Sequence, residues 1–386
     1  MTVRRAKLLA FSLVLVFLAG VVFGCGGQQA GTQKEQTIKI GLMAPLQGNV
    51  KTFGESVQKG FELALEEAGY KVGNFKIEKV IADDRNNSTE AANAATKLID
   101  SDKVVAIVGA VTSKCTVPAS EIAQARGVVM ISPTSTAANV TVDKGKRKDF
   151  IFRACFIDPF QGTVAARFAV NELKAKTAAI LYDQGNDYTV GLAKAFKDEF
   201  EKLGGKVLVE ETYAEGDKDF SAVLTTVAQK NPDILYLPDY YNKVSLIGQQ
   251  ARDKGIKAKF LGGDGWDSAE LNFKVMAGGY FTAHYSKDEP REAVRNWVKK
   301  FEAKYGSAPD SFATLGYDAT KMLLKAIETA GSADPAKIRD ALAALKDFPA
   351  VSGDMRFDAN GNPIKQAVVL QVQEDGTYKY ISTIQP

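Results

Sequence analysis

Short apolar runs alternate with amphipathic stretches along most of the chain. Residues 104–108 and 128–131, for example, are β-branched runs of strand length, and a polar loop follows each of them. Segments of helical length lie between and after such runs. Continuous apolar strands that alternate with helices are typical of a parallel sheet that is covered on both faces. The pattern therefore predicts an α/β fold built from doubly wound, Rossmann-like units.

The predicted elements form two series. Strands are expected at residues 37–44, 75–82, 104–108, 128–131 and 150–155, and then at 178–183, 206–213, 234–237, 259–262 and 279–284. Three helical stretches to about residue 345 and two paired strands at 366–373 and 378–383 complete the chain. Because no long polar linker separates the series, we expect two lobes joined by short hinge strands. The first lobe is predicted to hold residues 37–154 and 283–346, and the second 155–282 and 347–386.

Distinctive polar and aromatic side chains follow the predicted strands. They are Thr112, Ser113, Thr134, Ser135 and Thr136 in the first series, and Tyr188, Tyr240, Asp264 and Trp266 in the second. Ligands of doubly wound sheets bind outside the carboxyl ends of the strands, where these residues would gather. We therefore expect a binding site in a cleft between the lobes.

The residue types at these positions suggest one kind of ligand. The hydroxyls of Ser113 and Thr136, with backbone amides at helix starts, suit a carboxylate. Asp264 suits an ammonium group, and tyrosine or tryptophan rings suit the covering of a small molecule. A ligand that carries both a carboxylate and an ammonium is an amino acid.

Structural interpretations of the same residues stay open at this point. Ser113 could cap a helix that begins near residue 115, and Thr136 could close an ordinary turn. Asp264 could be a solvated turn residue, Tyr188 could pack on its own lobe, and Trp266 could belong to the core. The functional interpretation gains weight only because these candidates independently occupy turns after parallel strands.

Composition and charge exclude several classes of function. The chain has one histidine, His284, and three cysteines, Cys25, Cys115 and Cys155. We therefore expect no metal centre, no cofactor and no Ser-His-Asp catalysis, and we favour free thiols at Cys115 and Cys155. Three basic residues before residue 8 account for the net charge of +3, because the other 46 basic residues equal the 46 acidic ones. Such a balanced body argues against a nucleic-acid partner.

The N-terminus predicts export. A basic segment of seven residues precedes an apolar stretch at residues 8–23, which is short for a membrane span and typical of a signal peptide. The signal peptide would comprise residues 1–24. Cys25 follows directly, in the manner of a bacterial lipobox, so we expect it to be lipidated, with residues 25–36 as a polar tether. An ordinary signal peptide with an incidental cysteine is the alternative.

The order of short motifs also resembles a known family, the leucine/isoleucine/valine-binding type of solute receptors for ABC importers. The motifs are Lys39-Ile40-Gly41 with Ala44-Pro45, Ala82-Asp83-Asp84, Val108-Gly109 with Ser113, Pro118-Ala119, Ile131-Ser132-Pro133 with Thr136, Phe152-Arg153 with Gln161-Gly162, Tyr188-Thr189-Val190-Gly191, and Lys218-Asp219-Phe220. The resemblance covers about residues 37–384 and implies the type I periplasmic binding protein fold.

The resemblance also implies roles for residues. Ser113 would bind the carboxylate of an amino acid, Thr136 would contact both its carboxylate and its ammonium, and the Thr134 carbonyl would accept from the ammonium. Asp264 stands where many relatives carry glutamate as the partner of the ammonium. Phe53 falls near the side-chain pocket of the family, which Trp266 would narrow and which Thr112 would also line. Tyr188 and Tyr240 match tyrosines of the second lobe.

Three functional hypotheses follow. The first is an exported, lipid-anchored and monomeric receptor that closes on a branched-chain or other apolar amino acid and delivers it to an ABC permease. The second is a receptor of the same fold for an amide, a urea or an aromatic acid, for uptake or signalling. The third is an envelope hydrolase or transferase with Asp264 or Ser113 as a catalytic residue, which the shortage of histidine and the missing nucleophile elbow disfavour.

Overall fold

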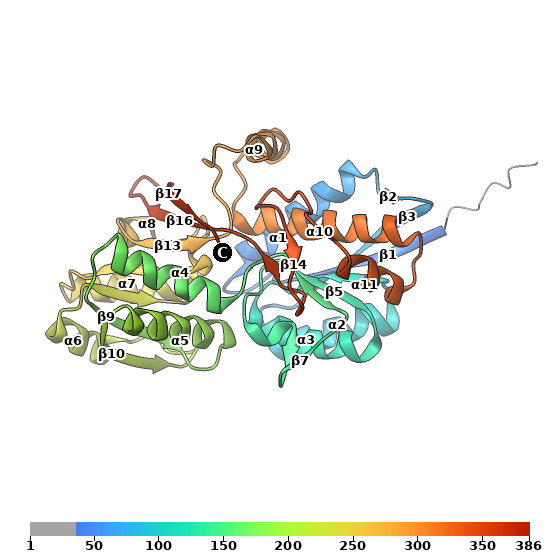
Figure 1. The fold of residues 1–386 in the computed structure, drawn as a ribbon. Coiled ribbons are helices and arrows are strands. Elements are labelled where there is room, and N and C mark those ends of the chain that lie inside the picture. Colours follow the sequence, from blue (N-terminus) through green and yellow to red (C-terminus); the bar gives the residue numbers. More distant parts are fainter. Residues whose placement is uncertain (1–35) are drawn as a thin grey trace, which may run out of the picture. The chain divides into compact units, whose positions relative to one another are not determined.

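The computed structural model describes residues 36–386 (Figure 1). The predicted signal peptide, the lipidation site Cys25 and nearly all of the predicted tether lie outside the described residues. None of the helices within residues 36–386 is both long and apolar enough to span a membrane.

The first sheet has the strand order β2-β3-β1-β4-β5-β8. Its strands are β1 (Gln36–Ala44), β2 (Lys71–Val72), β3 (Phe75–Asp83), β4 (Ala106–Val108), β5 (Val129–Ser132) and β8 (Ile151–Arg153). Every pair is parallel except β2 with β3. The helices α1 (Lys51–Glu67), α2 (Ser88–Thr96) and α3 (Ser113–Arg126) connect these strands. We call this sheet with its helices the first lobe.

The second sheet has the strand order β10-β9-β11-β12-β13-β16-β17. Its strands are β9 (Thr177–Asp183), β10 (Lys206–Tyr213), β11 (Ile234–Leu237), β12 (Lys259–Gly262), β13 (Tyr280–Ala283), β16 (Ala367–Val372) and β17 (Tyr378–Ile384). The strands up to β13 are parallel, and β16 and β17 are added antiparallel. The helices are α4 (Asp158–Asn171), α5 (Asp187–Lys202), α6 (Ser221–Lys230), α7 (Tyr241–Asp253) and α8 (Phe273–Met276). This is the second lobe.

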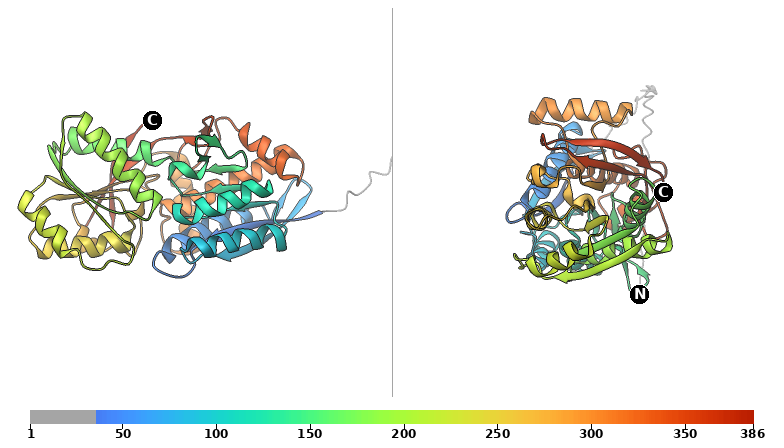
Figure 2. Two further views of the ribbon diagram at one scale, coloured as in Figure 1. Left: turned by 90° about the horizontal axis from the view of Figure 1, so that it is seen from below. Right: turned by 90° about the vertical axis from the view of Figure 1, so that its left-hand side faces the viewer.

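Both faces of the first sheet are covered by helices, as the unbroken apolar strands predicted (Figure 2). Alternate strand residues point to opposite faces. Ile40 and Leu42 of β1 join a cluster with Phe61 of α1, whereas Met43 joins a second cluster with Ala119 of α3. The predicted α/β class with two doubly wound lobes is confirmed.

After β13 the chain forms α9 (Glu292–Tyr305), α10 (Ser311–Ala330) and α11 (Pro335–Ala343) before it enters the second sheet again at β16. The helices α10 and α1 run side by side although they are far apart in sequence (Figure 1). The predicted strands are all present, with ends shifted by a few residues. The predicted lobe boundaries remain predictions.

Two short hairpins in the structure are not predicted from the sequence. They are β6 (Val142–Asp143) with β7 (Lys146–Arg147), and β14 (Arg356–Phe357) with β15 (Pro363–Ile364). Strands of two residues are too short to show an alternating pattern, so no periodicity predicts them.

The close approach of α1 and α10 depends on glycine. A Cβ atom on Gly60 would lie 2.0 Å from the Ala313 carbonyl oxygen, and one on Gly316 would lie 2.6 Å from the Val57 carbonyl oxygen. Both contacts are to backbone atoms, which cannot turn aside as a flexible side chain can. The two helices can therefore pack this closely only while these positions lack side chains.

We expect Gly60→Ala to lower the free energy of unfolding by about 1–3 kcal/mol, because the added methyl group forces the two helices apart. Urea unfolding followed by circular dichroism would measure the change. Gly216→Ala is the matched control, since nothing lies within 4 Å of its added Cβ, and it should change stability by less than about 0.5 kcal/mol. Equal stability of Gly60→Ala and the control would contradict this account of the packing.

Candidate functional site

The topology of the two sheets places one crevice in each lobe. In the first sheet the strand order reverses between β1 and β4, and in the second between β9 and β11. The loops on either side of a reversal diverge to opposite faces and leave a gap at the carboxyl ends of the strands. Phe53 follows β1 and Ser113 follows β4, while Tyr188 follows β9 and Tyr240 follows β11.

A small cavity lies where these loops of the two lobes meet. Its lining residues are Phe53, Val111, Thr112, Ser113, Thr134, Thr136, Tyr188, Tyr240, Asp264, Gly265 and Phe312. The cavity has a volume of only about 10 Å³, which is room for about one water molecule. An amino acid could therefore enter only after the lobes separate or the lining side chains turn.

Ser113 stands at the start of α3 but does not cap it. The residue before the first turn is Thr112, and its side chain makes no capping hydrogen bond. The Ser113 hydroxyl instead accepts from the Ala137 amide at 3.2 Å, and the Thr112 hydroxyl donates to the Asn86 side chain at 2.8 Å. Both hydroxyls are therefore tied to neighbouring first-lobe loops at the cavity wall.

Thr134 and Thr136 come from the loop after β5. The Thr134 hydroxyl donates to the Val111 carbonyl at 2.6 Å, which joins this loop to the one after β4. Thr136 also lines the cavity, and its carbonyl accepts from the Asp158 amide at the start of α4 at 3.0 Å. The first-lobe wall thus holds buried hydroxyls, of which those of Ser113 and Thr134 bond to backbone groups, whereas the Thr136 hydroxyl has no hydrogen-bond partner among the described residues.

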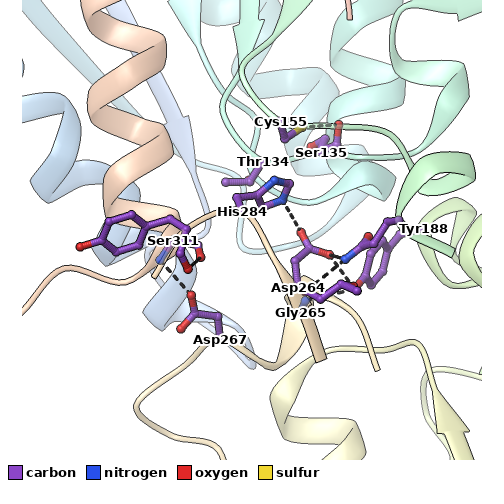
Figure 3. A network of polar contacts seen from close by, with 12 residues as sticks. Thr134, Ser135, Cys155, Tyr188, Asp264, Gly265, Asp267, His284 and Ser311 are labelled. Atoms are coloured by element: carbon purple, nitrogen blue, oxygen red, sulfur yellow. Dashed lines mark hydrogen bonds and ion pairs between the residues drawn. The ribbon is translucent and has the colours of Figure 1, made fainter. Parts of the chain in front are cut away.

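Asp264 is the only ionisable carboxyl group among the residues that line this cavity. Three side chains donate to it: Gln161 Nε2 at 2.9 Å and the Tyr188 hydroxyl at 3.0 Å on Oδ1, and His284 Nε2 at 3.0 Å on Oδ2. Figure 3 shows Asp264 between His284 and Tyr188. Burial of a carboxylate is costly unless donors replace its water, and these three donors supply that compensation. The alternative interpretation of Asp264 as a solvated turn residue does not hold, since Asp264 is 3% exposed.

His284 is a neutral partner of this carboxylate. Its ring is buried and stacks on Phe156, with a centroid separation of 3.7 Å and an interplanar angle of 30°. Burial lowers the pKa of His284 from 6.5 to about 4, although the hydrogen bond that it donates to Asp264 acts in the opposite direction. The imidazole is therefore uncharged at neutral pH and donates its Nε2 proton to the carboxylate.

Aromatic rings form the remaining walls. Tyr188 and Tyr240 stack in parallel with centroids 5.2 Å apart, and Phe53 stacks on Phe312 at 3.9 Å. The Phe53 ring also meets Tyr240 edge-on at 5.7 Å. These contacts join the first-lobe pair to the second-lobe pair across the cavity.

Two of the proposed site residues do not line the cavity. The Ser135 hydroxyl donates to the Val111 carbonyl at 3.0 Å and lies inside the first lobe. Trp266 is fully buried in the second lobe, where its indole donates to the Leu237 carbonyl at 3.0 Å. A Cβ on Gly262 would collide with the Trp266 ring, so this glycine makes room for a core tryptophan. Trp266 therefore belongs to the core of the second lobe, which was the structural alternative for this residue.

Several residues of the site are not predictable from local sequence patterns. Phe312 lies at the start of α10, far along the chain from Phe53, and no local pattern connects the two rings. Gln161 had been noted only as part of a family motif, and His284 had been given no role. His284 falls inside the strand predicted at residues 279–284, and Gln161 lies within α4 rather than in a loop after a strand, so the rule that located the other candidates did not apply to them.

Polar contacts also join the two lobes outside the cavity. The Asp267 carboxylate accepts from the Ser311 amide at 2.9 Å, and the Tyr241 hydroxyl donates to the Asn49 carbonyl at 3.0 Å. Burial and the nearby Asp310 carboxyl raise the pKa of Asp267 to about 7. These contacts hold the cavity closed in this conformation.

The thiols and acidic groups do not form a reactive or metal-binding centre in the part of the chain described. Cys115 and Cys155 are free and buried, and burial raises the pKa of each thiol to about 12, so neither is a thiolate at neutral pH. Residues 36–386 contain no group of three or more His, Cys, Asp or Glu side chains placed to hold a metal ion.

Known proteins resemble this chain over nearly its whole described length. A family model described as periplasmic binding protein matches residues 37–377. A Pseudomonas aeruginosa protein named leucine-, isoleucine-, valine-, threonine- and alanine-binding protein is 32% identical over 335 residues, which cover 84% of this chain and 87% of that protein.

Several solved structures resemble this chain in fold and over most of its length. A leucine-binding protein from Thermotoga maritima has a TM-score of 0.86 at 39% identity, covering 90% of this chain and 99% of its own. A branched-chain amino acid transporter substrate-binding protein from Streptococcus pneumoniae, in complex with isoleucine, has a TM-score of 0.84 at 33% identity, with 91% and 100% covered. A Rhodopseudomonas palustris solute-binding protein in complex with benzoate has a TM-score of 0.82 at 26% identity, with 91% and 97% covered.

The buried imidazole gives a testable pH dependence. Because the pKa of His284 is lowered from 6.5 to about 4 in the folded protein, only the unfolded chain takes up this proton between those values. The stability that a neutral His284 contributes is therefore complete above pH 6.5 and is lost as pH falls towards 4, by up to about 1.4 kcal/mol per pH unit.

Urea unfolding of the wild type and of His284→Gln between pH 7.5 and 4.5 would measure this effect as a difference between the two proteins. The subtraction removes the contributions of other titrating groups, such as Asp267. We expect the wild type to lose stability relative to the variant as pH falls. Parallel pH profiles would show that His284 titrates normally.

Proposed function

Since the chain belongs to the periplasmic binding protein family, we propose that it is the solute receptor of an ABC importer and binds an amino acid between its two lobes. One observation carries this proposal. A buried carboxylate of the second lobe and buried hydroxyls of the first lobe line the same cavity, with aromatic rings between them. Such a pairing suits a ligand that carries an ammonium and a carboxylate.

The first lobe would bind the carboxylate. Ser113 lies in the first turn of α3, where backbone amides point out of the helix and the helix dipole favours an anion. The hydroxyls of Ser113 and Thr136 would donate to the carboxylate oxygens, as in the family that the sequence resembles. The ammonium would contact Asp264, the Thr134 carbonyl and the Thr136 hydroxyl.

The side chain of the ligand would lie against the aromatic rings. Phe53 and Phe312 offer an apolar surface with no hydrogen-bonding atom, which favours a branched-chain or other apolar side chain over a polar one. The relatives from Thermotoga maritima and Streptococcus pneumoniae are described as leucine-binding and as bound to isoleucine, and this supports the same ligand class here.

Binding would work by hinge closure. Ligand contacts from both lobes exist only when the lobes are together, so the ligand shifts the population towards the closed form. The contacts of Asp267 with Ser311 and of Tyr241 with Asn49 belong to that form. No bond of the ligand is made or broken in this mechanism.

Delivery to the membrane completes the proposal. The sequence of residues 1–24 suits an export signal, and lipidation of Cys25 would hold the monomeric receptor near its permease through the tether at residues 25–36. Stable anchoring needs two or more acyl chains or an equivalent second signal, which the lipidation proposed for Cys25 would have to supply.

An aromatic acid is the second candidate ligand. A relative of 26% identity is described as bound to benzoate, and the four rings around this cavity would also cover a benzene ring. The two candidates differ at Asp264, because a carboxylate in that position stabilises an ammonium and offers nothing to a ligand without one.

We expect leucine, isoleucine or valine at large excess to raise the melting temperature of the wild-type protein by several degrees, since a thousandfold excess over Kd adds about 4 kcal/mol. Asp264→Asn should lose most of this shift, because removal of the charge weakens the ammonium contact by about 2 kcal/mol or more. A thermal-shift screen with the twenty amino acids, benzoate and simple amides would measure both.

Asp187→Asn is the matched control for this screen. It removes the same charge from an exposed position at the start of α5, outside the cavity lining, and should keep the full shift. A response to benzoate and to no amino acid would replace the first candidate by the second. A response to amino acids that survives Asp264→Asn would leave the ligand class intact and remove Asp264 from its recognition.

We expect Cys25→Ala to move the protein from the membrane fraction to the soluble fraction of the envelope, because the acyl chains have no other attachment site. Fractionation of cells that express the full chain, with immunodetection in each fraction, would test this. Cys115→Ala serves as the control for loss of a thiol. Retention of Cys25→Ala in the membrane would contradict the lipid anchor without touching the ligand proposal.

A further inference from the structure

The chain's one histidine lies one hydrogen bond away from the proposed ligand site and has no part in the function proposed above. His284 follows β13 directly, and its ring reaches towards the loop after β12 that carries Asp264 (Figure 3). Both side chains are buried, with 1% and 3% of their surface exposed. The contact between them is therefore protected from solvent.

The hydrogen bonds of Asp264 are distributed unequally over its two oxygens. A carboxylate has about four acceptor positions, two on each oxygen. Oδ1 accepts from both Gln161 and Tyr188, whereas Oδ2 accepts from His284 alone. Among the donors in residues 36–386, three of these positions are therefore used, and the position left for a ligand is on Oδ2. That is the oxygen that His284 holds.

The ring of His284 is itself fixed in orientation. Stacking on Phe156 sets the ring plane. The carboxylate can only accept, so the proton must be on Nε2, and Nδ1 has no hydrogen-bond partner within the described chain. The ionisable groups that act on the ring are Asp264 and, on the approach to β16, Lys365. The imidazole therefore presents one N–H group in one direction, towards Oδ2.

We propose that His284 is a positioning residue for ligand recognition: as a neutral Nε2–H donor it holds Asp264 Oδ2 in the direction of the ligand's ammonium group. This inference rests on the proposed function, and it concerns the side chain that directs Asp264 rather than the ligand contact itself. A neutral donor suits this task, because an imidazolium in the same place would repel the ammonium and cancel the charge that attracts it.

The alternative is that His284 only fills space beside Phe156. A space-filling role predicts that a residue of similar volume preserves binding whether or not it can donate a hydrogen bond. A positioning role predicts that binding is preserved only by a residue that can donate a hydrogen bond from the position of the imidazole Nε2. Glutamine and leucine separate these roles, because both fill much of the space and only glutamine carries an amide donor near the position of the imidazole Nε2.

The test is isothermal titration of L-leucine into the wild type, His284→Gln, His284→Leu and Thr282→Val. We expect His284→Leu to weaken leucine binding about 10-fold to 100-fold, the effect of losing a hydrogen bond to a charged group. His284→Gln should stay within about threefold of the wild type. Thr282→Val is the matched control on the same strand, since its buried hydroxyl has no partner among the described residues, and it should also stay within about threefold.

A second titration series uses 4-methylpentanoate, which is leucine without its amino group. Its affinity should be equal, within about threefold, in the wild type and in His284→Leu, because it makes no contact that His284 positions. Circular dichroism and melting temperature of each variant show that it is folded. Equal leucine affinity of His284→Leu and the wild type, or equal losses in His284→Leu and His284→Gln, would overturn the positioning role.

Failure of this inference can be told apart from failure of the proposed function. If the wild type binds none of leucine, isoleucine and valine, the amino-acid proposal fails before any variant is compared. If the wild type binds leucine and Asp264→Asn weakens it while His284→Leu does not, the ligand proposal stands and only the role of His284 is lost.

Discussion

The compensation of one buried charge organises the second lobe. Asp264 is a buried residue of the cavity lining, and a carboxylate in that position is stable only if donors replace the water it has lost. Gln161, Tyr188 and His284 supply them, and they come from three different elements of the lobe. The carboxylate thus joins the start of α4, the start of α5 and the end of β13 into one polar network, which also fixes the Tyr188 ring that lines the cavity.

The sequence was sufficient for everything that depends on local pattern and on the general topology of parallel sheets. Apolar runs located the long strands, and the rule that ligands bind at strand ends brought Ser113, Thr136 and Asp264 together. The sequence did not predict contacts between residues that lie far apart in the chain. Phe312 reaches Phe53 only because α10 packs on α1, and His284 reaches Asp264 only because β13 lies beside β12. Trp266 shows the reverse error, since its place in a loop after a strand resembled a ligand position although Gly262 makes room for it in the core.

Many of the contacts between the lobes are polar. Hydrogen bonds join Asp267 to Ser311, Tyr241 to Asn49 and Thr52 to Ser268, an ion pair joins Lys114 to Glu215, and Phe53 meets Tyr240 and Tyr241 edge-on. Each hydrogen bond of this kind contributes about 1 kcal/mol net, because open lobes would exchange it for water. A closed form held by such contacts can exchange with an open form. A ligand that adds contacts to both lobes can shift this equilibrium towards the closed form.

The tight packing of α1 on α10 has a consequence for how ligands are told apart. Gly60 and Gly316 bring the two backbones together, and the stacked rings of Phe53 and Phe312 stand on these same helices. Their pairing therefore belongs to the interior of one lobe and does not depend on closure. In the proposed mode of binding, the surface that would contact the ligand side chain is therefore already formed within one lobe, whereas the carboxylate that would contact the ammonium belongs to the other lobe. The side chain would then meet its complementary surface in the open form, and the ammonium would meet Asp264 only as the lobes close.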